Sequence, residues 1–326
     1  TVSPATLTFT EDNWNTARTV TVTGVNDNDR DRHQDYKISL SAGDQHLENP
    51  QVTTVAGSGT AGSTNATGTA ARFNYPRAII SDGTNLYVVD QSNHTIRKIV
   101  ISTGVVTTFA GYPGSSGSTN GTGTSARFNY PRGITTDGTN LYVADTNNHM
   151  IRKIVISTGV VSTFAGTTSY GSTNATGTSA RFKYPRGITT DGTNLYVADS
   201  DNHRIRKIVI SSGAVTTIAG SGSTGNTDGT GTSATFQYPR GIATDGKNIY
   251  VANTNRQSIR KIIISSGVVT TLAGSGHANQ TGSTNGTGTA ARFYNPRGIT
   301  TDGTNLYVAD YNNHMIRKIV ISTGVV

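Results

Sequence analysis

One sequence unit recurs five times along the chain, and this repetition limits the possible folds more than any other feature. When the copies are aligned on the residue before a phenylalanine, successive copies lie 55, 54, 54 and 57 residues apart. These anchor residues are Arg72, Arg127, Arg181, Thr235 and Arg292. A fixed period of this length predicts one supersecondary unit per copy, with each unit covering a face of the next.

Each copy carries four strand signals separated by turn chemistry. In the second copy they are RGITTD (132–137), NLYVAD (140–145), MIRKIVIS (150–157) and VVSTFAG (160–166), joined by DGTN, TNNH and STG. This order predicts a four-stranded antiparallel meander. Both faces of its third strand are apolar, so each sheet needs cover on both sides. Five such sheets stacked radially give an all-β fold, a five-bladed β-propeller.

The stretch NLYVADTNNHMIRKI (140–154) and its sisters resemble the NHL repeat family. The resemblance covers residues 51–326 and implies a propeller that serves mainly as a binding platform. A few family members are enzymes, and some bind RNA through a basic face. We therefore expect two regions, a segment over 1–50 and an NHL-type propeller over 51–326.

The fifth copy stops before its fourth strand is written, and a matching strand stands before the first copy. VTTVAG (52–57) has the pattern of that missing strand, so we predict that it closes the ring and removes the exposed edges. Two alternatives stay open. In the first, the chain is a six-bladed ring that has lost one blade. In the second, residues 52–57 complete the last blade of a neighbouring molecule.

The long connections between copies share one face with the TNNH loops, and long loops in compact domains are often functional. We place any binding on this face. Its candidates include the arginine after each proline: Arg77, Arg132, Arg186, Arg240 and Arg297. They include the tyrosine before that proline: Tyr75, Tyr130, Tyr184 and Tyr238, with Tyr294 shifted by one position in the last copy. They also include the loop histidines: His94, His149, His203 and His314.

The histidines have two interpretations, a ring of metal ligands or bases and a loop residue that holds backbone; we favour the second. The Gly-rich stretches such as GSTNGTGT lack a following helix and a lysine, so we predict flexible loops rather than phosphate cradles. Asp82, Asp137, Asp191, Asp245 and Asp302 belong to Asp-Gly turns, and turn geometry explains them.

The fourth copy suggests an ion pair, because it replaces the anchor arginine with Thr235 and the aspartate that ends the second strand with Asn253. Buried charges need partners, so their joint loss indicates contact. We predict four structural salt bridges: Arg72–Asp90, Arg127–Asp145, Arg181–Asp199 and Arg292–Asp310. The same copy has Gln257 in place of the histidine, which breaks any five-fold symmetric site.

Composition excludes several classes of site. The chain has no cysteine, which rules out disulfides, thiolate metal sites and a cysteine nucleophile. No apolar run is long enough to span a bilayer. The net charge of +8 is spread over the repeats rather than gathered in a tract, so we do not expect nucleic acid as a partner. No motif for a nucleophile or a paired acid and base occurs. We expect no cofactor and no enzyme activity.

The first fifty residues differ in kind. Trp14 and TVTGVNDN (21–28) resemble part of a Calx-β-like bacterial β-sandwich repeat. The resemblance implies a secreted or surface-displayed bacterial protein, and the partial sandwich and the absent initiator Met suggest an excised piece. Asp27, Asp29 and Asp31 are weak calcium candidates, because arginine and histidine residues interleave with them.

Together these features predict a non-catalytic propeller for protein–protein contact or self-assembly, in a filament, a surface layer or an adhesin. The partner is a protein, including a second copy that receives a strand from residues 1–57. A carbohydrate-binding lectin is the first alternative, and a metal-dependent propeller lyase or lactonase is the second.

Overall fold

The computed structural model describes residues 2–3, 21–22 and 52–326 of the chain. It divides into two compact units, Thr1–Val52 and Thr53–Val326. In the first unit, β1 (Val2–Ser3) pairs with β2 (Thr21–Val22) in an antiparallel sense. The predicted β-sandwich otherwise lies outside the described residues, as do the calcium candidates Asp27, Asp29 and Asp31.

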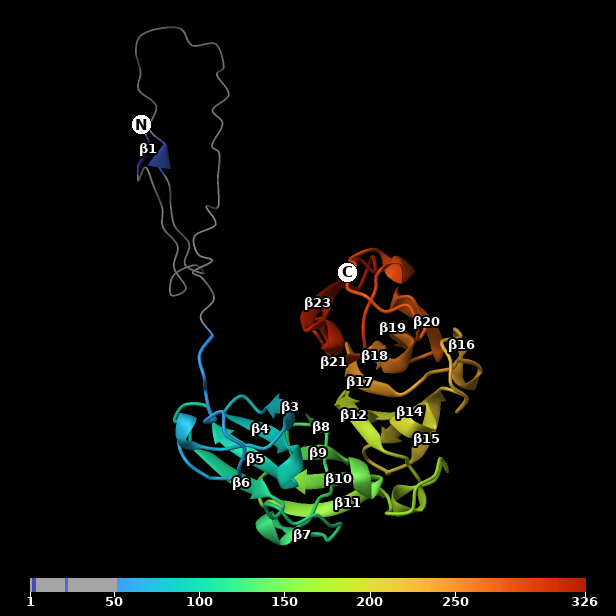
Figure 1. Cartoon of the computed structure of the whole chain (residues 1–326). Coiled ribbons are helices and arrows are strands. Elements are labelled where there is room, and N and C mark those ends of the chain that lie inside the picture. The colour runs from blue at the N-terminus through green and yellow to red at the C-terminus, as the bar shows by residue number, and fades with distance from the viewer. Residues whose placement is uncertain (1, 4–20, 23–51) are drawn as a thin grey trace, which may run out of the picture. The chain divides into compact units, whose positions relative to one another are not determined.

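The second unit is a β-propeller of five antiparallel sheets (Figure 1). Blade 1 comprises β3 (Pro76–Ser81), β4 (Asn85–Asp90), β5 (Thr95–Val100) and β6 (Val106–Ala110). Blade 2 comprises β8 (Gly133–Thr136), β9 (Asn140–Asp145), β10 (Met150–Val155) and β11 (Val160–Gly166), with β7 (Gly121–Thr122) on its outer edge. Blade 3 comprises β12 (Pro185–Thr190), β13 (Asn194–Asp199), β14 (Arg204–Val209) and β15 (Val215–Ala219).

Blade 4 comprises β17 (Pro239–Thr244), β18 (Asn248–Asn253), β19 (Ser258–Ile263) and β20 (Val268–Gly274), with β16 (Gly229–Thr230) on its outer edge. Blade 5 has three strands, β21 (Pro296–Thr301), β22 (Asn305–Asp310) and β23 (Met315–Val320). In each blade a short 3-10 helix follows the second strand, as η4 (Thr146–Asn148) and η6 (Ser200–Asn202) illustrate. The predicted meander of four strands is confirmed in blades 1 to 4.

The core lies between neighbouring blades rather than within them. Leu141 and Val143 of β9 pack toward blade 1, whereas the alternate residues Tyr142 and Ala144 pack toward blade 3. Because successive strand residues point to opposite faces, one alternating strand supplies two separate cores. This packing explains why a single copy could not bury its own apolar residues.

The innermost strands approach one another closely around the axis. Gly187 lies in β12, and a Cβ atom built on it would overlap the backbone carbonyl oxygen of Arg240 in β17. Gly133 and Gly241 stand at the equivalent place against their own next blades. Glycine is therefore needed here for space. The first copy carries Ala78 at this position instead.

The predicted closure of the ring by residues 52–57 is wrong. Among the described strands β22 alone pairs with β23, so the outer edge of β23 carries no fourth strand. Figure 1 shows β23 and β3 on opposite sides of an opening in the ring. Gly57 instead donates its N–H to the carbonyl of Gly68 in the connection that enters blade 1. The same hydrogen bond occurs one copy later, where the N–H of Gly111, just after β6, donates to the carbonyl of Gly123 in the connection that enters blade 2. Residues 52–57 therefore contact blade 1 as the end of β6 contacts blade 2. These local bonds hold the segment on blade 1 and away from blade 5.

Candidate functional site

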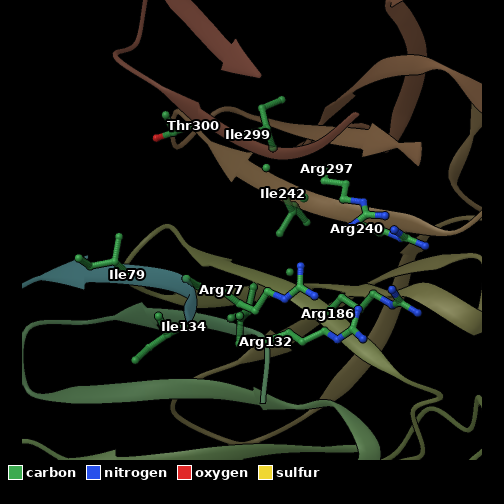
Figure 2. Close-up of a pocket in the computed structure, with 16 residues that line it drawn as sticks. Arg77, Ile79, Arg132, Ile134, Arg186, Arg240, Ile242, Arg297, Ile299 and Thr300 are labelled. Carbon is green, nitrogen blue, oxygen red and sulfur yellow. The ribbon is translucent and has the colours of Figure 1, made fainter. Parts of the chain in front are cut away.

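Five arginines gather at the axis of the propeller. Each is the residue after the proline that leads into an innermost strand, and together they line a pocket of about 340 Å³. Figure 2 shows their guanidinium groups on one side of this pocket and the isoleucines of the same strands on the other. The set is Arg77, Arg132, Arg186, Arg240 and Arg297. The structure thus brings together one of the residue groups that the sequence placed on the loop-rich face.

Few groups offset this positive charge. Among the described residues, Asp201 is the one carboxylate within 4.0 Å of these guanidinium groups, with its Oδ1 3.9 Å from Nη2 of Arg186. Arg77 donates from Nε to the amide oxygen of Gln91, and Arg297 stacks on Tyr311 with its Cζ 3.4 Å from the ring centroid.

The arginines of blades 2 and 4 carry no such compensation. Within the described chain, the Nε atoms of Arg132 and Arg240 are buried and have no hydrogen-bond partner. Burial, followed by repulsion from Arg186 and Arg77, lowers the pKa of Arg132 to about 10. Burial and repulsion from Arg186 and Arg297 lower the pKa of Arg240 to about 10 as well. Both remain cationic at neutral pH, so the five arginines repel one another. A bound anion would reduce this repulsion.

The loop histidines join neighbouring blades. Nδ1 of His94 accepts a hydrogen bond from the backbone N–H of Tyr130 in the next copy at 3.1 Å, and the two rings meet edge to face. His149 binds Tyr184 in the same way at 3.1 Å. Since Nδ1 accepts, the neutral ring carries its proton on Nε2. Burial lowers the pKa of His94 and His149. The interpretation of these residues as backbone-holding groups is confirmed.

Of the remaining two histidines, one follows this pattern and one does not. His203 accepts from Tyr238 at 3.2 Å, whereas His314 stands in the last blade and faces no following copy. In the fourth copy Gln257 replaces the histidine, and its amide oxygen accepts from the N–H of Asn295 at 2.7 Å. Asn295 occupies the tyrosine position, because YNPR inverts the usual order and moves Tyr294. The two departures from the repeat are therefore one coupled change across a blade interface.

The predicted tyrosines do not line the axial pocket. Tyr75, Tyr130, Tyr184 and Tyr238 all adopt positive φ angles, as does Asn295 at the same position in the last copy. The turn they form directs the arginine two residues later toward the axis. Tyr75 is 68% exposed and borders a separate hollow with Phe73. The structure gives these tyrosines a backbone role beside the arginines.

The aspartates predicted to form salt bridges pair with arginines other than those predicted. Asp145 binds Arg152 of β10 at 3.0 Å, and both side chains are fully buried. Burial raises the pKa of Asp145 to about 6, against the opposing effect of Arg152 and of the bonds that the carboxylate accepts. Arg127, the predicted partner, donates to the backbone carbonyls of Thr124 and Ala126. The pairing fails because β10 lies directly beside β9, whereas Arg127 sits in the connection.

The same correction holds in three other copies. Asp90 pairs with Arg97 at 3.0 Å, Asp199 with Arg206 at 2.8 Å and Asp310 with Arg317 at 3.1 Å. The predicted partners Arg72, Arg181 and Arg292 instead offer their backbone carbonyls to these arginines. One buried arginine per blade thus contacts both the aspartate and the chain segment that precedes the blade.

The fourth copy moves this carboxylate to another position. Arg260 pairs with Asp228 at 2.7 Å, and Asp228 stands where the second copy has Asn120. Asn253 stands where the second copy has Asp145. The buried arginine keeps one carboxylate, although the aspartate and the asparagine have exchanged places. Sequence reasoning noticed the loss at Asn253 and missed the gain at Asp228.

These arginines also fix the long connections. Arg152 donates from Nη2 to the carbonyl of Thr119 and to the amide oxygen of Asn120, at 3.0 and 2.8 Å. Equivalent bonds from Arg206 hold Thr173 and Asn174. The Gly-rich stretches predicted as flexible loops are therefore anchored on their own blades.

The Asp-Gly turns serve the role predicted for them. Asp137 accepts hydrogen bonds from the N–H groups of Thr139 and Asn140 and from the hydroxyl of Tyr142. Burial alone would raise the pKa of Asp137, but these bonds outweigh it and lower the pKa. The described residues contain no group of three or more histidines and carboxylates placed to hold a metal ion. They also contain no helix that is long and apolar enough to cross a bilayer.

Comparison with known proteins agrees with the repeat structure. The family model described as "NHL repeat" matches residues 128–154 and 182–208, which lie in blades 2 and 3. The chain contains NHL repeats. A relative named NHL repeat-containing protein 2, from Gallus gallus, is 30% identical over 318 residues, which cover 86% of this chain and 43% of that protein. The chain thus spans less than half the length of this NHL relative.

Two solved structures share the propeller architecture of the NHL repeats. An auxiliary nutrient binding protein from Bacteroides thetaiotaomicron aligns with a TM-score of 0.52 and 19% identity, covering 76% of this chain and 69% of that one. A chain of a nidogen/laminin complex aligns with a TM-score of 0.55 and 16% identity, covering 76% and 77%. At these identities the likeness concerns the fold.

Proposed function

We propose that this propeller is a non-catalytic binding module and that it takes an anionic ligand at the axial ring of arginines. The observation that carries the proposal is the convergence of five guanidinium groups on one pocket with one carboxylate beside them. Guanidinium groups bind carboxylate, sulfate and phosphate oxygens in a planar, paired geometry. Those of Arg132 and Arg240 are the least compensated and are therefore the main anchors.

Several features favour binding over catalysis. General acid–base chemistry needs a second titratable group within hydrogen-bond reach of the reacting atoms. Here the pocket walls are arginine, glycine and isoleucine, with Ala78 and Thr300. The histidines that could serve as bases are engaged in blade contacts, such as His149 with Tyr184.

The test is a calorimetric titration with tripolyphosphate, a multivalent anion without hydroxyl groups, at low ionic strength. We expect binding to the native chain and at least a tenfold loss of affinity in the double variant Arg132→Gln/Arg240→Gln. The matched control is Lys153→Gln/Lys207→Gln, which removes two cations from β10 of blade 2 and β14 of blade 3, outside the pocket. No binding by the native chain, or an equal loss in the control, would refute the proposal.

Self-association is a second candidate, and one observation favours it. Ile316 of β23 is 73% exposed and Ile79 of β3 is 57% exposed, while their equivalents Ile151 and Ile134 are buried between blades. The two open faces have the residue types of the closed interfaces, so blade 1 of a second copy fits blade 5 of the first. Such a head-to-tail contact would extend into rings or filaments.

Sedimentation velocity over a range of concentrations tests this second candidate. We expect association in the native chain and monomers after Ile316→Glu. Ile263→Glu is the control, because Ile263 is 37% exposed and lies in β19 of blade 4, which has a neighbouring blade on each side. Monomers of the native chain at all concentrations would exclude the contact.

Display outside the cell remains part of the proposal. It is supported by the resemblance of the first fifty residues to repeats of secreted and surface proteins. Fractionation of the source cells, followed by detection with an antibody to the propeller, tests it directly.

A further inference from the structure

We propose that blade 4 carries a second anion site, separate from the axial pocket, which takes a phosphate or sulfate group. The site is a hollow of about 430 Å³, and Arg256, Thr224, Thr227 and His277 are among the residues that line it. None of its lining residues also lines the axial pocket. The inference therefore goes beyond the proposed function, and the two sites can be tested separately.

The cation of this site is a departure from the repeat. Arg256 ends the 3-10 helix η8 (Thr254–Arg256), at a position where the other four copies have an asparagine. That asparagine has a structural role, because Asn148 donates from Nδ2 to the carbonyl of Gly117 and to the carboxylate of Asp145. The same two bonds are made by Asn93, Asn202 and Asn313.

Another residue makes the corresponding bonds in blade 4. Nδ2 of Asn253 donates to the carbonyl of Gly225, the equivalent of Gly117, at 3.4 Å and to Oδ1 of Asn226 at 2.9 Å. Arg256 has no hydrogen bond or ion pair with the described part of the chain. Its Nε is buried, whereas Nη1 and Nη2 are not buried and are available to a ligand in the hollow.

No acid of the hollow neutralises this arginine. The described residues that line the hollow include no aspartate or glutamate. Asp228 follows the lining residue Thr227, but its carboxylate pairs with Arg260 at 2.7 Å. A guanidinium that lacks a carboxylate partner in a partly enclosed hollow favours an anionic ligand.

The hollow is already formed in the free chain. On one side Asn226 is fixed, since its Nδ2 donates to the hydroxyl of Thr271 at 3.1 Å. Gly276 lies against it with a φ of 73°, and a Cβ atom at this glycine would overlap Nδ2 of Asn226. The loop that follows Gly276 is held by Gln257, which donates from Nε2 to the carbonyl of Ala278 at 3.2 Å. A preorganised site loses less conformational entropy when its ligand binds.

The donors come from three segments of the chain, which favours a tetrahedral anion. Arg256 belongs to η8, Thr224 and Thr227 to the connection that enters blade 4, and His277 to the connection that leaves it. Within the described chain Thr227 makes hydrogen bonds through its backbone only, so its hydroxyl is available. A carboxylate has two oxygens in one plane, which a single guanidinium can occupy. A phosphate or sulfate group has further oxygens for donors on its other sides.

The experiment is a calorimetric titration with inorganic phosphate of the chain that carries Arg132→Gln/Arg240→Gln, which removes the main anchors of the axial pocket. We expect one site, and at least a tenfold loss of affinity when Arg256→Asn is added, because charge-assisted bonds are lost. Arg256→Asn restores the residue of the other four copies, so the variant should fold, which its thermal unfolding checks. The matched control is Lys247→Gln, which removes an exposed cation from a turn of the same blade and should change the affinity by less than about twofold.

Three results would overturn the inference: no phosphate binding by the axial double variant, unchanged binding after Arg256→Asn, or an equal loss after Lys247→Gln. None of them affects the proposed function, which depends on the loss of tripolyphosphate binding in Arg132→Gln/Arg240→Gln. Acetate bound as tightly as phosphate would overturn the choice of a tetrahedral anion.

Methyl phosphate and methyl sulfate, titrated in parallel, distinguish the two sources of such a group. Tighter binding of the first assigns the site to phosphate esters, and tighter binding of the second assigns it to sulfate esters. Binding of neither ester, with free phosphate still bound, would overturn the inference that the site takes such a group as part of a larger ligand.

Discussion

At the scale of single residues, the most informative positions are those where one copy departs from the others. Arg260 is fully buried in the fourth copy, as Arg152 is in the second, yet its carboxylate comes from Asp228 instead of the strand aspartate. Burying an arginine is costly without an anion, because the desolvation of the charge must be offset by a close partner. What the blade requires is one carboxylate against this guanidinium, and two different positions can supply it.

This requirement predicts a rescue. Asp145→Asn should reduce the free energy of unfolding by about 3 kcal/mol, because Arg152 is left buried without an anion. Adding Asn120→Asp should restore more than half of that loss, since the double variant copies the arrangement of Asp228 and Asn253. Urea denaturation of the two single variants and the double variant gives the coupling energy. Additive effects would show that the two positions do not share Arg152.

The histidines predict a pH dependence. Burial lowers the pKa of His94, His149 and His203 in the folded chain below that in the unfolded chain, about 6.5. The unfolded chain therefore binds protons first, so the stabilisation is complete above pH 6.5 and declines as the pH falls below it. Asp145 and Asp199, whose pKa burial raises to about 6, contribute the opposite trend, so the decline is measured as a difference between two chains. Melting temperatures at pH 8, 7, 6 and 5 should fall more steeply in the native chain than in His149→Gln/Tyr184→Asn, which copies Gln257 and Asn295. Equal slopes would contradict the assignment.

At the scale of elements, the contact between innermost strands decides how the arginines are presented. Gly187 allows β12 to approach β17 at the carbonyl of Arg240, and the arginine side chains of both strands depart from this region. Space at one glycine thus controls the separation of two guanidinium groups. The first copy tolerates Ala78, and there the neighbouring strand β8 is shorter than its equivalents.

This contact predicts that Gly187→Ala is costly. The added methyl group overlaps backbone rather than a movable side chain, so we expect a loss of about 1–3 kcal/mol in the free energy of unfolding. The same change should weaken anion binding, because Arg186 and Arg240 are pushed apart. Ala78→Gly, at the equivalent position of blade 1, is the control and should leave stability nearly unchanged. Thermal unfolding and the tripolyphosphate titration provide the two readouts.

At the scale of the whole molecule, the ring of arginines exists because five copies place one cation each at a common axis. No single blade has an unusual charge, and the positive field arises from their arrangement. Mutual repulsion and burial both disfavour the charged forms, as the lowered pKa values of Arg132 and Arg240 show. The site is therefore maintained at some expense in stability, a common condition of binding sites.

The destabilisation caused by the arginine ring can be measured. At low ionic strength, Arg132→Gln/Arg240→Gln should raise the free energy of unfolding by about 1 kcal/mol while it reduces anion binding. Because salt screens repulsion between the guanidinium groups, this stabilisation should shrink as salt is added. Lys153→Gln/Lys207→Gln should show no comparable gain. A loss of stability in the arginine variant would mean that these side chains are structural.

Much of the fold could be predicted from sequence, and the site only in part. The repeat predicts blades, strand order and the loop-rich face, because alternation and turn residues are local signals. The arginine after each proline was one of several candidates, and its selection depends on the convergence of strands from five copies at the axis. Asp201 was missed, although an acid at a position otherwise held by Ser92 and Asn147 was a readable signal. The predicted partner of Asp145 was wrong, because contact was inferred from two changes in the same copy. Thr235 and Asn253 replace an arginine and an aspartate that do not form a pair.

The coupled pair Gln257–Asn295 has a consequence for how this chain can be cut and rejoined. The exchange of Asp228 and Asn253 lies within one copy and would travel with it in any duplication or transplant of that copy. Gln257 and Asn295 belong to different copies, so replacing the fourth copy with the third would set a histidine against Asn295. Blade shuffling should therefore succeed when the crossover keeps residues 257 to 295 together, which makes the joint between blades, rather than the blade, the unit of exchange.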